Sequence, residues 1–96
     1  MPEEVIELIL YVSPTSAACL KVRGDIESAL KAFDATRVRF EVLDVSREVR
    51  RAVEDQVIFT PTLVKRRPDP PAWFVGDAGG QMVPVLLASC GVERIR

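Results

Sequence analysis

The chain has 96 residues, of which 48% are apolar and 28% charged, and this composition is typical of one globular domain spanning residues 1–96. Its 13 basic and 14 acidic side chains leave a net charge of −1, which argues against nucleic acid as a partner because general nucleic-acid binding needs a basic excess. The sequence contains no histidine, so histidine acid–base catalysis and histidine metal ligation are excluded.

The first predicted element is a strand over residues 5–12, which is apolar at nearly every position. A strand covered on both faces has this pattern, so we place it centrally in a sheet. Either Ser13 or Ser16 would cap the next helix, which is predicted to run to about Phe33. Its buried stripe follows three- and four-residue spacing and comprises Cys19, Val22, Ile26, Leu30 and Phe33.

The second predicted strand alternates between apolar and charged residues over residues 37–42 and ends in Leu43-Asp44-Val45, and Arg39 and Glu41 lie on its polar side. This alternation is typical of a strand at the edge of a sheet that has one solvent-exposed face. Ser46 would then cap a short helix from Arg47 to about Gln56. The predicted inner side of that helix consists of Val49, Ala52 and Val53.

Thr60, Pro61 and Thr62 precede a short β-branched run and predict a tight turn into a third strand. The Thr60–Pro61 bond could be cis, at a cost of roughly 0.5–1 kcal/mol, or an ordinary trans bond, and the residues leave both open. The turn would bring a strand over residues 62–66 beside the first one.

The end of the chain is predicted to contain a hairpin, a joint and a helix. Residues 67–71 are rich in proline and predict a hairpin turn, after which residues 72–75 return antiparallel. Residues 76–80 predict a flexible joint, which lacks the lysine and hydroxyl residue of a phosphate loop. A last helix from Met82 to Cys90 would hold Pro84 in its first turn and end at Gly91.

These elements predict an α/β fold of order β-α-β-α-β-β-α with a mixed four-stranded sheet, which is the thioredoxin-like order. Helical crossovers between the first three strands favour parallel pairing, and the hairpin makes the fourth antiparallel. We expect the sheet order second, first, third, fourth, which puts both predominantly apolar strands inside.

The two cysteines, Cys19 and Cys90, are too far apart in sequence for a disulfide framework or a metal motif. We expect both to be buried and to behave as small hydrophobic residues. A redox thioredoxin needs two cysteines two residues apart at the start of the first helix, and Ser13–Ser16 occupies that place. A redox or thiol-transfer enzyme using Cys19 remains the alternative function.

No stretch reaches the roughly 18 apolar residues of a membrane span, which argues against a membrane protein. Glu3 and Glu4 make the start of the chain acidic, unlike a secretory signal. The sequence therefore predicts a cytoplasmic protein. Lys65, Arg66 and Arg67 form a compact basic cluster, which is either an exposed strand end or a site for an acidic patch on a partner protein.

The segment from Glu54 to Lys65 resembles one family closely. It is similar to the glutamate-aspartate-glutamine and threonine-proline-threonine-leucine-valine-lysine segment of KaiB, the clock protein family that remodels KaiC. Further matches are Leu10-Tyr11-Val12, Val42-Leu43-Asp44-Val45, the prolines at 68 and 70, and the Gly76-Asp77 pair. The loop before Pro14 and the tail after Asp77 depart from the family pattern, so a divergent paralogue or the sensor domain of a clock histidine kinase is also consistent.

The resemblance implies a non-enzymatic interaction module without a cofactor or metal. It implies docking on the N-terminal ATPase ring of KaiC, with KaiA or a clock histidine kinase as further partners. Lys65, Arg66 and Arg67 would face KaiC, whereas Arg39 and Glu41 would lie near the KaiA side. The matched residues expected to have structural roles are Thr60, Pro61, Thr62, Asp44, Gly76 and Asp77.

The resemblance also implies an alternative ground state, often tetrameric, in which the C-terminal half is refolded. The sequence favours the thioredoxin-like state, in which the chain is expected to be a monomer. Residues 47–54 are strong helix formers, and Thr62-Leu63-Val64 favours a strand. Pro84 would remove a hydrogen-bond donor from a strand but is tolerated in the first turn of a helix. Association into a homotetramer would oppose this preference.

Overall fold

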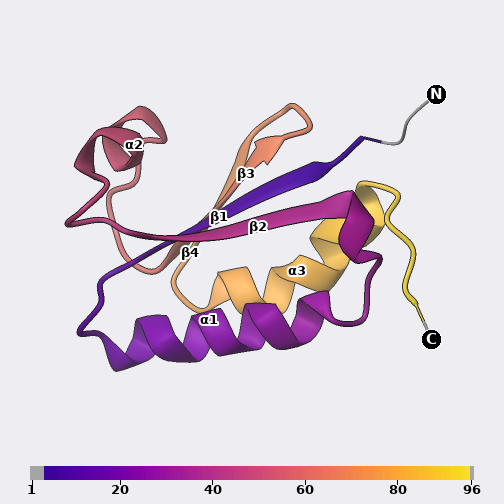
Figure 1. The fold of residues 1–96 in the computed structure, drawn as a ribbon, viewed down its shortest axis with the longest axis horizontal. Coiled ribbons are helices and arrows are strands. Elements are labelled where there is room, and N and C mark those ends of the chain that lie inside the picture. Colours follow the sequence, from indigo (N-terminus) through magenta and orange to yellow (C-terminus); the bar gives the residue numbers. More distant parts are fainter. Residues whose placement is uncertain (1–3, 96) are drawn as a thin grey trace.

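A computed structural model describes residues 4–95, and its elements follow the predicted order (Figure 1). The N-terminal half comprises β1 (Ile6–Val12), α1 (Ala17–Leu30), a 3-10 turn (Ala35–Arg37) and β2 (Val38–Asp44). The C-terminal half comprises α2 (Val49–Glu54), β3 (Thr62–Arg67), β4 (Ala72–Val75) and α3 (Ala78–Ser89). The predicted α/β class with a mixed four-stranded sheet is therefore confirmed.

The strands lie in the predicted order β2-β1-β3-β4, but one expected direction is wrong. β2 runs parallel to β1, whereas β3 runs antiparallel to both β1 and β4. The register explains this, because Asp44 ends β2 opposite Val12 and Thr62 begins β3 opposite Tyr11. The chain through α2 therefore stays at one end of the sheet, and β3 has to run back from there.

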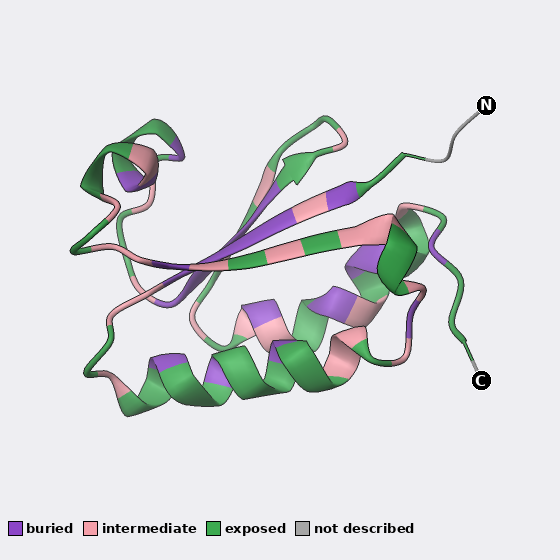
Figure 2. Cartoon of the chain, in the orientation of Figure 1, coloured by how far each residue is buried: buried purple, intermediate pink, exposed green. Residues whose placement is uncertain are grey.

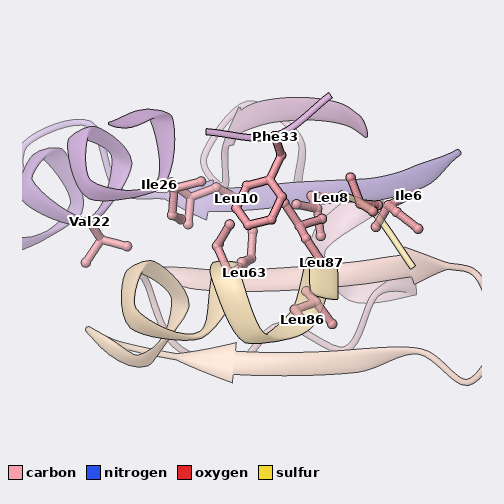
Figure 3. Packing of buried hydrophobic residues seen from close by; sticks show 11 residues of the cluster. Ile6, Leu8, Leu10, Val22, Ile26, Phe33, Leu63, Leu86 and Leu87 are labelled. Carbon is pink, nitrogen blue, oxygen red and sulfur yellow. The ribbon is translucent and has the colours of Figure 1, made fainter. Parts of the chain in front are cut away.

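The two faces of the sheet are covered unequally. α1 and α3 lie side by side on one face, and the short α2 lies on the other (Figure 1). The main core lies beneath the two long helices, where β1 contributes Ile6, Leu8 and Leu10 (Figure 3). A smaller cluster on the second face contains Ile9, Tyr11, Leu43, Ala52 and Val64.

α1 begins after Ser16, whose side chain accepts a hydrogen bond from the Cys19 amide and caps the helix. The helix ends at Leu30, three residues earlier than predicted, with Lys31 as its C-cap. Phe33 lies outside the helix, yet it is 2% exposed and packs in the main core. The spacing that placed Phe33 on the helical stripe therefore identified its burial but not its backbone conformation.

α2 has six residues and begins after Glu48 rather than Ser46. The predicted inner stripe is wrong for two of its three members, because Val49 and Val53 are 58% and 70% exposed and only Ala52 is buried. The inner side instead comprises Ala52 and, three residues further on, Asp55, which are both buried. Figure 2 shows the resulting exposure along α2.

α3 begins at Ala78, so the predicted flexible joint is limited to the residues before it. Gly79 and Gly80 are helical, and Pro84 lies in the helix interior rather than in the first turn. The glycines allow a close approach, because a Cβ on Gly79 would lie 3.2 Å from the Leu63 Cβ atom. A Cβ on Gly80 would lie 2.9 Å from the Asp25 Cβ atom on α1. As predicted, Gly91 follows the helix, and it has a φ of +79°.

Gly80→Ala is expected to lower the free energy of unfolding by about 1–3 kcal/mol, because the new methyl group overpacks the contact between α1 and α3. Gly24→Ala is the matched control, since nothing lies within 4 Å of a Cβ at this exposed position on α1. It should stabilise the protein by roughly 0.5–1 kcal/mol through helix propensity. Urea unfolding compares the two variants, and equal stabilities would contradict the close helix packing.

Candidate interaction surface

The turn before β3 is held by backbone and hydroxyl hydrogen bonds. The Thr60–Pro61 peptide bond is cis, and Pro61 is buried. The Pro61 carbonyl accepts a hydrogen bond from the Gly76 amide at 2.8 Å, and Gly76 has a φ of +68°. The Thr62 hydroxyl donates to the Phe59 carbonyl at 2.6 Å. The hydrogen bond between Gly76 and Pro61 therefore connects the end of β4 to the turn.

The two acidic residues expected to have structural roles differ in their surroundings. The Asp44 carboxylate accepts hydrogen bonds from the Ser46 hydroxyl at 2.6 Å and the Ser46 amide at 2.8 Å. These bonds hold the pKa of Asp44 below its usual value, the hydroxyl contributing most. Asp77 is the exposed residue before α3, and its side chain makes no capping hydrogen bond. Asp44 therefore fixes the turn after β2, whereas the Asp77 side chain does not cap α3.

A polar network joins the end of α2 to three strands. The Tyr11 hydroxyl donates to the buried Asp55 carboxylate, and the Trp73 indole N–H donates to the Asp55 carbonyl at 2.7 Å. The Arg66 Nε atom lies 3.4 Å from the Asp55 Oδ1 atom, and Arg66 Nη1 lies 3.8 Å from Glu7 Oε1. Burial, and then the hydrogen bond to Asp55, raises the pKa of Tyr11. Asp55 therefore fastens α2, which buries little of its own surface, to the sheet.

The three basic residues of β3 do not form the single exposed cluster that the sequence predicted. Lys65 is only 7% exposed, because it lies opposite Leu8 and Ala72 on the face beneath the long helices. Arg66 is exposed but is paired with Asp55 and Glu7. Arg67 is exposed at the end of the strand. A register shift between Glu7 and Leu8 brings both arginines beside Glu7.

Arg39 and Glu41, predicted to share an edge surface, are both exposed on β2. Glu41 forms an ion pair with Arg51 of α2, with an N–O distance of 2.9 Å. Arg39 lies opposite Glu7 and lines a surface hollow with Arg67. Glu41 therefore links the edge strand to α2, while Arg39 lies across β1 from the basic end of β3.

An apolar patch that the sequence analysis missed lies at the α2 end of the sheet. We define it as Ile58, Phe59, Trp73 and Val75, which are 85%, 65%, 41% and 53% exposed. Val75 lies opposite Thr62, whose hydroxyl bonds the Phe59 carbonyl, and Trp73 bonds the end of α2. The sequence did contain a signal for this patch. Ile58 and Phe59 are adjacent, large and apolar just before the Pro61 turn, and they fit neither helical nor strand periodicity.

The cysteines are both free, but they differ in burial. Cys19 is 1% exposed, and its sulfur accepts a hydrogen bond from the Ser13 amide at 3.4 Å. Cys90 is half-buried at the end of α3, contrary to the expectation that both thiols are buried. A fully buried Cys19 is poorly placed to attack a disulfide, so the geometry does not favour the thiol-transfer alternative.

Neither a membrane-spanning helix nor a metal-binding cluster is found among residues 4–95. In this range, no helix is both long enough and apolar enough to cross a membrane. Over the same residues, no group of three or more acidic or thiol side chains is placed to hold a metal ion.

The model of the KaiB domain family matches residues 9–87. The circadian clock protein KaiB3 of Synechocystis sp. is 29% identical over 72 residues, which cover 75% of this chain and 71% of KaiB3. The N-terminal domain of SasA from Synechococcus elongatus superposes with a TM-score of 0.74 at 22% identity, covering 91% and 84% of the two chains. The germline thioredoxin Deadhead from Drosophila melanogaster superposes with a TM-score of 0.76 at 16% identity. The match covers 91% of this chain and 82% of Deadhead. The two structural similarities establish a thioredoxin-like fold.

Proposed function

The chain belongs to the KaiB family, and from this premise we propose that it is a non-enzymatic interaction module that binds a KaiC-like ATPase ring in its thioredoxin-like fold. The observation that carries the proposal is the apolar patch. Soluble proteins seldom leave large apolar side chains together at the surface unless a partner covers them. Here Ile58 and Phe59 are adjacent and largely exposed, beside a turn that hydrogen bonds hold in place.

The proposed binding surface extends from the apolar patch along the edge strand β4 to the exposed arginines at the end of β3. Aromatic and arginine side chains carry most of the energy at protein interfaces, and Phe59, Trp73 and Arg67 are of these types. Arg67 supplies charge at the end of the strand, whereas Lys65 contributes through packing because it is buried. A partner with an acidic rim around an apolar centre fits this arrangement.

Charge reversal tests this surface. Arg67→Glu is expected to weaken capture of a purified KaiC-like N-terminal ATPase ring by about tenfold or more, because it places like charge against an acidic rim. Lys31→Glu is the matched control, since Lys31 is exposed at the end of α1 on the opposite face of the sheet. Pull-down with both variants and wild type measures the effect. Equal capture of Arg67→Glu and Lys31→Glu would contradict the proposed surface.

The β2 edge of the sheet is the second surface that we propose for partners. β2 lies at the edge of the sheet, and Arg39 and Glu41 alternate with half-buried residues along it. An exposed edge strand offers unpaired backbone groups to another chain. We assign this edge to a KaiA-like protein or a clock histidine kinase, as the family resemblance implies. The two free thiols are consistent with the reducing cytoplasm as the site of action.

The free chain is expected to be a thioredoxin-like monomer rather than a refolded tetramer. Helix over 49–54 and strand over 62–67 agree with the propensities of those segments. Backbone chemical shifts of the protein alone test this expectation. Helical shifts over 49–54 with extended shifts over 62–67 would support it, and the reverse pattern would contradict it. Light scattering of the same sample should give the mass of one chain, and a fourfold mass would count against it.

A further inference from the structure

A surface hollow of about 370 Å³ lies where β1 and β2 begin and β3 ends, which is the end of the sheet far from α2. Its walls are formed by Glu4, Val5, Glu7, Arg39 and Arg67. Arg39 on β2 and Arg67 on β3 are both register partners of Glu7 on β1. Neighbouring strands lie about 5 Å apart, so the two arginine backbones are separated by about 10 Å across β1. Two guanidinium groups can therefore reach one ligand from opposite sides.

The charges around this hollow are incompletely paired. Glu7 already has Arg66 as a partner, with an N–O distance of 3.8 Å. Within residues 4–95, neither Arg39 nor Arg67 forms an ion pair, whereas Arg51 pairs with Glu41 and Arg23 pairs with Glu27. Two guanidinium groups thus face the hollow without a carboxylate bound to them, and Glu4 is the remaining acid in its wall.

We propose that the Arg39–Arg67 hollow binds an oxyanion group, a carboxylate or a phosphate, carried by a protein partner. Guanidinium groups present planar pairs of N–H donors that match both oxyanions and form charge-assisted hydrogen bonds with them. This inference deepens the proposed function and rests on it for the identity of the partner. The hydrogen bonding of the anion itself depends only on the two arginines.

The arrangement has a consequence for partner choice. The family resemblance assigned Arg67 to one partner surface and Arg39 to another, but both line this one hollow. An anionic group bound by both arginines therefore excludes a second partner from the same place. Two partners compete only if each places an anionic group in the hollow, because the apolar patch and Glu41 lie outside its walls.

Titration of the full chain with inorganic phosphate, with acetate, and with chloride at matched ionic strength tests the proposal. Amide shifts followed by NMR should saturate with phosphate or acetate over residues 5–7, 38–40 and 66–67, and should change little with chloride. The double variant Arg39→Gln and Arg67→Gln should weaken oxyanion binding about tenfold or more. Arg50→Gln, at an exposed arginine on α2, should bind like wild type.

A second variant separates charge from geometry. Arg39→Lys keeps the charge but loses the planar pair of donors, so it should bind phosphate more weakly than wild type. Equal phosphate binding by wild type and the double glutamine variant would overturn the proposal, as would equal shifts with chloride. Failure of phosphate binding with intact capture of the ATPase ring would reject this inference alone. Phosphate binding without capture of the ring would reject the proposed partner alone.

Discussion

Asp55→Ala is expected to lower the free energy of unfolding by about 1.5–3 kcal/mol, the range for removing a buried hydrogen bond to a charged group. Asp55 is 9% exposed and accepts the Tyr11 hydroxyl, while Arg66 Nε lies 3.4 Å from its other oxygen. Its loss leaves the Tyr11 hydroxyl with the Arg51 carbonyl alone, at 3.2 Å. Urea unfolding of both proteins measures the difference.

The control for this prediction is the neighbouring acid. Glu54 is exposed at the end of α2, so Glu54→Ala should change the free energy of unfolding by less than about 0.5 kcal/mol. Asp55→Asn keeps an acceptor for Tyr11 and should fall between the two alanine variants. If Asp55→Ala were no less stable than Glu54→Ala, the network would not fasten α2 to the sheet.

The same network makes a prediction at alkaline pH. The folded protein raises the pKa of Tyr11 above its ordinary value of 10.0, so the folded state retains the hydroxyl proton more strongly than the unfolded chain. The resulting stabilisation is complete below about pH 10, the pKa of tyrosine in the unfolded chain. It is lost as the pH rises from there through the higher pKa of the folded state. Tyr11→Phe should remove this part of the alkaline loss of stability.

Phe59→Ser is expected to weaken binding of the KaiC-like ring by about thirtyfold or more, because buried aromatic anchors at interfaces contribute about 2 kcal/mol or more. Leu20→Ser is a closely matched control, since Leu20 on α1 is 64% exposed and Phe59 is 65% exposed. Neither variant should lose much stability, as both side chains lie at the surface. Calorimetric titration compares their affinities, and equal losses would mean that the apolar patch has no special role.

Local sequence patterns predicted the order of the elements and the centre of the sheet. The apolar run of β1 and the residues around Pro61 were enough to place β1 and β3 side by side. The direction of β3 was missed because a helical crossover normally returns the chain to the opposite end of the sheet. Here the chain through the six-residue α2 stays at the end where β2 finishes.

The candidate site was harder to predict, because it depends on register and on side-chain pairing. Three consecutive basic residues gave no indication that Lys65 would lie opposite Leu8 on the covered face. The meeting of Arg39 and Arg67 requires the sheet order, the register of two strand pairs and a register shift. Asp55 was recognised only as part of a family match, since its burial depends on Tyr11, which lies 44 residues away in the sequence.

Hydrogen exchange of this protein, alone and with the KaiC-like ATPase ring, tests the central claim most directly. The account predicts that the ring slows amide exchange over residues 49–59 and 66–75, which contain α2, the apolar patch and the exposed arginines. Exchange in α1 should stay unchanged, because α1 covers the opposite face of the sheet. Unchanged exchange throughout, or slowing confined to α1, would contradict the claim that this family member binds through the α2 and β4 face.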